Sequence, residues 1–98
     1  MAPKKLHALR LLLEHPEGLY GSELVHISEG KLNRGTVYTL LERLIEDRLV
    51  REEEVAPTTS FLLARTRHHI TAKGKAAYAD FLKEHSLSMA PFRQHVSV

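Results

Sequence analysis

The sequence has 98 residues, no cysteine, a charged fraction of 27% and a formal net charge of +2 at pH 7. This length fits one small domain, since hydrophobic cores divide into separate domains only at roughly 250 residues or more. The lack of cysteine excludes disulfides and thiolate metal sites, and no apolar run approaches the roughly 18 residues that a membrane helix needs. Because no apolar signal segment opens the chain, we expect a soluble, cytoplasmic protein.

A helix is predicted from Pro3 to the residue before His15 and Pro16, with leucines three and four residues apart. Ala8 and Leu11 widen its apolar stripe beyond one core face. A domain of this size has little surface to bury by itself, so a second apolar surface favours a homodimer. We expect the first and last helices to form the interface, through Leu6, Ala8, Leu11, Tyr78, Phe81 and Leu82.

A turn at 16–21 separates this helix from a short second one, which Ser22 is expected to cap and Gly30 to end. Asn33 is the expected N-cap of a third helix at 33–47. The apolar residues of this helix recur at i, i+3, i+4, i+7 and i+8, and they are Val37, Leu40, Leu41, Leu44 and Ile45. This is the strongest periodic signal in the chain.

Two strand-like runs follow, at 49–56 and 61–71, with a turn at 57–60 between them. Together they predict a two-stranded hairpin. Thr71 can cap a last helix, which is expected to end near 85–88 because the residues after it show no clear period.

This order of three helices, a hairpin and a further helix is that of a winged helix-turn-helix, so the fold class is mainly α with a small β-hairpin (α+β). The domain is expected to span 3–86, followed by a flexible C-terminal tail at 87–98. In this fold the second helix of the pair enters the major groove of DNA with its N-terminal residues first. That geometry explains why the helix at 33–47 begins with polar residues and carries Glu46 and Asp47 at the far end, away from the phosphates.

The sequence therefore predicts that the third helix and the wing at 56–67 bind double-stranded DNA. The expected DNA-binding residues are Lys31, Asn33, Arg34, Thr36, Tyr38, Thr39, Arg43, Arg65 and Arg67. Arg43 has two interpretations, since it can contact a phosphate or pair with Glu46 or Asp47 along the helix. The two wing arginines can contact phosphates or a minor groove, or their charge can protect the edge of a strand.

Three segments resemble the PadR family of bacterial transcriptional regulators: YGSELV at 20–25, LNRGTVYTLLERLIEDRLV at 32–50 and HHITAKGKAAYADFL at 68–82. The resemblance implies a winged-helix regulator of transcription. It places Gly35, Thr36, Tyr38, Leu41, Arg43 and Leu44 in the recognition helix, with Thr71 and Gly74 at the start of the helix after the wing. Many relatives have glycine before the first wing strand, where this chain has Arg48.

Members of that family usually add a long C-terminal helical region, which builds the dimer and often part of an effector pocket. We interpret this chain as a short member that lacks the region, and we therefore expect no small-molecule effector. By this interpretation we expect the protein to act as a homodimeric repressor.

Other chemistry finds little support in the sequence. The seven histidines fit no metal-ligand spacing, so no metal site and no cofactor are expected. No nucleophile elbow, glycine-rich phosphate loop or pair of carboxylates in an apolar setting is present, so we expect no enzyme activity. The alternative function is a protein–protein interaction module of the same fold, which binds a protein partner through the wing, where SFLLA lies, or through the first helix.

Overall fold

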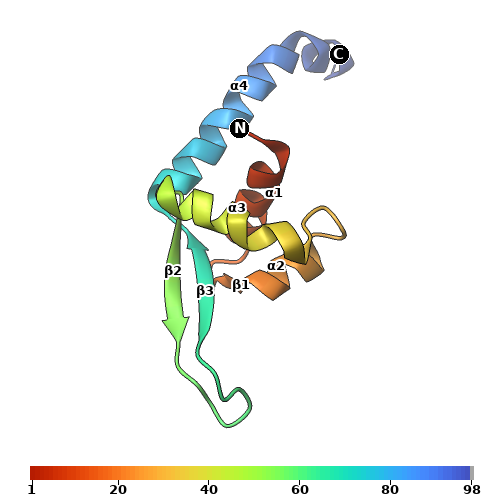
Figure 1. The fold of residues 1–98 in the computed structure, drawn as a ribbon. Helices are drawn as coiled ribbons and strands as arrows, with labels where there is room; N and C mark the ends of the chain where they lie inside the picture. Colours follow the sequence, from red (N-terminus) through yellow and green to blue (C-terminus); the bar gives the residue numbers. More distant parts are fainter. Residues whose placement is uncertain (98) are drawn as a thin grey trace.

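The computed structural model describes the backbone of residues 1–97 and the side chains of residues 1–85. Its elements are α1 (Pro3–Glu14), β1 (Leu19–Tyr20), α2 (Gly21–Ile27), α3 (Arg34–Glu46), β2 (Val50–Val55), β3 (Arg65–Ile70) and α4 (Ala72–Ser97). Figure 1 shows the β2–β3 hairpin projecting from one end of the helical body, while α4 leaves the other end. The predicted order of the four helices and the hairpin and the α+β class are confirmed.

The sheet has three antiparallel strands in the order β1-β3-β2, one more than the hairpin that the sequence predicts. In the added strand, β1, Leu19 pairs with His68 of β3. The sequence assigns Leu19 to the turn at 16–21. Two residues are too few to show the alternation by which a strand is recognised. At the other end of the hairpin, β3 begins at Arg65, so residues 61–64 belong to the wing loop rather than to the strand.

Local capping signals account for the starts of α3 and α4. The Asn33 side-chain oxygen accepts a hydrogen bond from the Thr36 backbone N–H at 3.0 Å, and the Thr71 hydroxyl accepts one from Gly74 N–H at 2.9 Å. Both predicted caps are confirmed. Ser22, by contrast, does not cap α2, which has Tyr20 as its N-cap. The Tyr20 N–H instead donates to the carboxylate of Glu23 at 2.8 Å, the backward half of a capping box.

The turn after α3 contains a left-handed residue. Arg48 has φ of 63°, a conformation in which a side chain with a Cβ is strained. Two hydrogen bonds hold it there, from Arg48 N–H to Ile45 O and from Leu49 N–H to Leu44 O, both 2.9 Å. This is the Schellman pattern, in which glycine is the usual left-handed residue. The arginine therefore occupies a position that favours glycine.

One hydrophobic core joins all the helices to the sheet, and its buried side chains are Ala8, Leu9, Leu11, Leu12, Leu19, Leu24, Leu32, Val37, Leu41, Leu44, Leu49 and Val50. Because α1 packs against α3, β3 and α4, it is buried on several sides. Ala8 is fully buried and Leu11 is only 6% exposed. The expected second contact surface at these two residues is therefore wrong, since both side chains belong to the core of the monomer.

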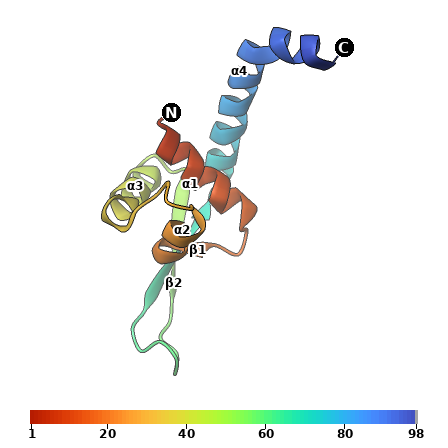
Figure 2. The same cartoon turned by 90° about the vertical axis from the view of Figure 1, so that its right-hand side faces the viewer.

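The last helix is longer than the sequence predicts. It continues to Ser97, past the expected end at 85–88 and into the segment 87–98, for which the sequence predicts a tail. Figures 1 and 2 show that its C-terminal part extends beyond the other elements. Apolar periodicity reports which side of a helix is packed, so a stretch that meets no other element needs no such period. Whether 87–98 moves independently of the domain stays a prediction.

Candidate nucleic-acid interface

The two sides of α3 have opposite properties. Val37, Leu41 and Leu44 are buried in the core, so they fix the position of the helix. The polar residues expected at its start all lie on the exposed side, and they are Asn33, Arg34, Thr36, Tyr38 and Thr39. The helix is thus anchored by its apolar stripe, and its N-terminal turn is accessible to a partner.

Some of these side chains are occupied by the helix itself. Asn33 Oδ1 accepts from the Thr36 backbone N–H and from the Thr36 hydroxyl, each at 3.0 Å. Asn33 therefore keeps only its amide NH2 group for another molecule. Arg34 and Thr39 form no side-chain hydrogen bond or ion pair with any described residue, so their donors are available.

A cleft of about 550 Å³ separates the start of α1 from α3. It is lined by Ala2, Pro3, Lys4, Lys5, Thr36, Thr39, Leu40 and Arg43. The two lysines therefore lie beside the predicted site, although the sequence did not assign them to it. Their clustering at the N-terminus was the available signal, but no local pattern relates residues 4 and 5 to α3.

Arg43 forms no ion pair with Glu46 or Asp47, so within the described chain the pairing interpretation is not observed. The partner of Asp47 is Lys5, at 3.8 Å. The guanidinium of Arg43 stays exposed on the cleft at the side of α1. Its contact with a phosphate remains a prediction.

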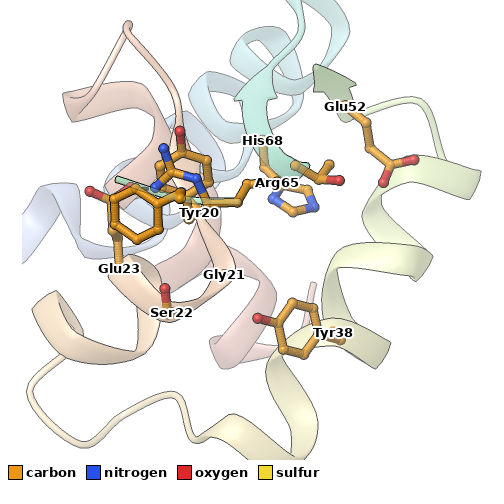
Figure 3. Close-up of a pocket in the computed structure, with 10 residues that line it drawn as sticks. Tyr20, Gly21, Ser22, Glu23, Tyr38, Glu52, Arg65 and His68 are labelled. Carbon is orange, nitrogen blue, oxygen red and sulfur yellow. Dashed lines mark hydrogen bonds between the residues drawn. The ribbon is translucent and has the colours of Figure 1, made fainter. Parts of the chain in front are cut away.

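Tyr38 points away from that cleft, towards the wing. It lines a second cleft of about 590 Å³, together with Gly21, Glu52, Arg65 and other residues of α2 and the sheet. Figure 3 shows Tyr38 on one side of this space and Arg65 with Tyr20 on the other. The predicted residues of α3 therefore divide between two faces of the helix, with Thr36, Thr39 and Arg43 on the α1 side and Tyr38 on the wing side.

The wing arginines lie against aromatic rings. Arg65 Cζ is 4.3 Å from the ring centroid of Tyr20 and 3.8 Å from that of Phe61, and Arg67 Cζ is 5.1 Å from Tyr20. Both side chains are half-buried. Sequence reasoning missed the roles of Tyr20 and Phe61, because Tyr20 is far from the wing in the chain. Phosphate contacts by these arginines remain predictions.

Lys31 is exposed, but it lies with a different group of residues. It lines a cleft of about 410 Å³ between α1 and α4, whose other lining residues are Pro3, Leu6, His7, Arg10, Tyr78, Phe81 and Leu82. Four of the expected interface residues thus share one groove, whereas Ala8 and Leu11 do not reach it. These four are Leu6, Tyr78, Phe81 and Leu82. Leu82 is the most exposed of them, at 46%.

The two adjacent histidines of β3 have different environments. His68 is buried against β1, where Nδ1 lies 3.4 Å from Leu19 O, and burial lowers the pKa of its imidazole below the usual range. His69 Nε2 lies 2.8 Å from Glu53 Oε1, a contact that lowers the pKa of the Glu53 carboxyl. Among the residues described, no group of three or more potential ligands could hold a metal ion. No helix in that part of the chain has the length and apolar character to cross a membrane.

The fold is similar to that of solved transcriptional regulators. A PadR family regulator from hypervirulent Clostridium difficile R20291 has a TM-score of 0.77 and 17% identity, covering 97% of this chain and 99% of its own. A PadR-like transcription factor from Bacteroides fragilis has a TM-score of 0.67 and 26% identity, covering 93% and 88%. For the YusO protein from Bacillus subtilis the TM-score is 0.76 and the identity 21%, covering 94% of this chain but only 60% of that one.

No family model and no curated protein matches the sequence. The structural neighbours nonetheless confirm, at the level of the fold, the resemblance to PadR-family and other winged-helix regulators. The match covers 99% of the Clostridium difficile regulator, so that PadR protein has no long additional region outside the match.

Proposed function

We propose that this protein is a sequence-specific regulator of transcription that binds double-stranded DNA and acts as a repressor. The observation that carries the proposal is the arrangement of α3, whose apolar stripe is held in the core while Arg34, Tyr38 and Thr39 are exposed at its start. A helix presented in this way can enter a major groove by its N-terminal end. The winged-helix regulators with a similar fold support the same function.

The charges on α3 favour this orientation. Its positive dipole end and Arg34 lie at the N-terminus, where phosphates would approach. Glu46 and Asp47 lie at the opposite end, where they would repel phosphates if the helix lay flat on the duplex. Entry by the N-terminal end keeps these carboxylates at a distance from the DNA.

We further propose that two copies form a homodimer through the groove between α1 and α4. Leu6, Tyr78, Phe81 and Leu82 supply apolar surface there. A two-fold dimer would place two α3 helices in successive major grooves of a palindromic site, about 34 Å apart along the duplex. We place this regulator in the cytoplasm, without enzymatic activity, a cofactor or a small-molecule effector.

The test is a gel shift with the promoter of the protein's own gene against a scrambled duplex, at two salt concentrations. The wild-type protein should prefer the promoter and bind both duplexes more weakly at high salt. Arg34→Ala should mainly reduce the difference in affinity between the promoter and the scrambled duplex, because a lost base contact reduces discrimination by about 1 to 3 kcal/mol. Arg67→Ala should weaken binding to the promoter and to the scrambled duplex by the same factor. If both variants bind like the wild type at every salt concentration, this surface does not bind DNA.

A second function is favoured by the tip of the wing. Phe61 is 52% exposed and Leu62 and Leu63 are each 81% exposed, an unusual concentration of apolar surface for a loop. In this alternative the protein keeps the fold but uses the wing to bind a protein partner. The gel shift separates the two functions, because the alternative predicts no preference for any duplex.

A further inference from the structure

The wing loop is tied to the helix-turn-helix by three side chains, Tyr20, Phe61 and Arg65, which we call the Arg65 cluster. The Arg65 guanidinium carbon lies against both rings, 4.3 Å from the centroid of Tyr20 and 3.8 Å from that of Phe61. Figure 3 shows Arg65 extending across Tyr20. A flat guanidinium can stack on aromatic faces in this way, which a lysine ammonium does not reproduce.

Arg65 is partly removed from water by these contacts. Its Nε is buried and has no hydrogen-bond partner among the residues described, and the same holds for the Tyr20 hydroxyl. No carboxylate forms an ion pair with Arg65 in the described chain. Cation–π attraction is stronger when the cation is desolvated, so the rings are the principal partners of this charge.

The cluster joins two parts of the fold that are otherwise distant in sequence. Tyr20 is fixed at the start of α2, because its N–H donates to Glu23 at 2.8 Å. Phe61 is fixed in the loop by a turn, in which Thr58 N–H donates to Phe61 O at 2.7 Å and Phe61 N–H donates to the Thr58 hydroxyl at 3.1 Å. Since α2 packs against α3, the contact through Arg65 relates the loop to the recognition helix.

The loop itself has no charge with which to bind phosphates. Residues 56–64 contain no lysine, arginine, aspartate, glutamate or histidine. Any contribution of this loop to DNA binding must therefore come from short-range contacts, which depend on where the loop is held.

We propose that Arg65 is a positioning residue, which acts through Phe61 and Tyr20 to hold the wing loop at a set distance from α3, rather than a phosphate contact. The inference rests on the proposed DNA-binding function. It assigns the charge-dependent contact of the wing to Arg67 and gives Arg65 a role that requires its planar shape.

The experiment compares Arg65→Lys, which keeps the charge but not the planar group, with Phe61→Leu, which keeps an apolar residue but not the ring. Both should lower affinity for the promoter by about tenfold while the salt dependence stays as in the wild type. Arg67→Ala is the control, and it should lower the salt slope by about one unit. If Arg65→Lys binds like the wild type while Arg65→Gln lowers the salt slope, Arg65 is a phosphate contact and the proposal is wrong.

Hydrogen exchange without DNA supplies an independent measurement. The amides of residues 58–64 should exchange faster in Arg65→Lys and in Phe61→Leu than in the wild type. The variant that carries both substitutions should exchange no faster than either single variant, because both changes disrupt the same contact. Unchanged exchange in both variants would overturn the proposal. If the variants exchange faster but the wild-type protein does not bind DNA, Arg65 still positions the wing loop, and it is the proposed DNA-binding function that is refuted.

Discussion

The ring of Tyr38 lies against Gly21, so closely that a Cβ added at Gly21 would be 2.5 Å from Tyr38 Cε1. This contact joins the first residue of α2 to the exposed start of α3. The absence of a side chain at Gly21 lets the ring occupy that space, and Figure 3 shows the two residues at the edge of the cleft below the sheet. Tyr38 remains 52% exposed, so its position is set while its surface stays accessible.

Gly21→Ala should displace the Tyr38 ring and lower promoter affinity by about 1 to 3 kcal/mol, the value of one base contact. The free energy of unfolding should change little, because a ring at the surface can move. The decisive control is the same substitution in a Tyr38→Ala background, where no ring remains to be displaced. If Gly21→Ala weakens binding equally in both backgrounds, its effect does not act through Tyr38.

Gly74→Ala should destabilise the fold strongly. A Cβ at Gly74 would overlap the carbonyl oxygen of Leu49, which is backbone and cannot rotate away. We expect a loss of about 2 kcal/mol or more in the free energy of unfolding, measured by urea denaturation. Gly35→Ala is the matched control, because the nearest atom to its Cβ would be 3.4 Å away. That substitution should stabilise the helix by up to about 1 kcal/mol.

Arg48→Gly should stabilise the protein. Arg48 has φ of 63° in the turn that ends α3, and glycine adopts this conformation without a clash of its Cβ. The expected gain is about 1 kcal/mol, measured as a shift in the urea midpoint at constant m-value. The neighbouring substitution Glu46→Gly, inside the helix, should have the opposite sign. A loss of stability on Arg48→Gly would mean that its side chain contributes more than the strain removes.

Stability should fall as the solution becomes acidic. Burial lowers the pKa of His68 below the ordinary value of 6.5. The pKa of His7 is also lowered, mainly by burial and to a smaller extent by the positive charges of Arg10 and Lys31. The unfolded chain therefore binds protons more readily than the folded one, so stability is complete above about pH 6.5 and declines as pH falls through the lowered folded pKa values. Urea titrations between pH 5 and pH 8 test this. His68→Asn should flatten the decline, and an unchanged profile in that variant would exclude His68 as its source.

The homodimer should depend on Leu82 and not on Leu11. Leu82 is 46% exposed on the groove between α1 and α4, so Leu82→Glu should give a folded monomer. Leu11 is 6% exposed in the monomer core, so Leu11→Glu should unfold the protein by burying a carboxylate. Sedimentation and circular dichroism distinguish these outcomes. A wild-type protein that sediments as a monomer at tens of micromolar would contradict the dimer.

Short-range signals in the sequence were sufficient for the order of the helices and the hairpin and for two of the caps. Asn33 and Thr71 each bond to an N–H three residues further along the chain, so their role depends on local spacing. The polar start and apolar stripe of α3 are likewise properties of one helix, read at its own period. These features led from the sequence to a winged helix and to the expected DNA-binding surface.

The tertiary structure decided which residues meet across the chain. It paired Leu19 with His68 in a third strand, buried Ala8 and Leu11 between several elements, and brought Tyr20 to Arg65. Periodicity tells which side of an element is packed, but it does not identify the element that packs there. Contacts between residues 20 and 65 depend on how helices and strands pack in three dimensions, so no local pattern in the sequence could predict them.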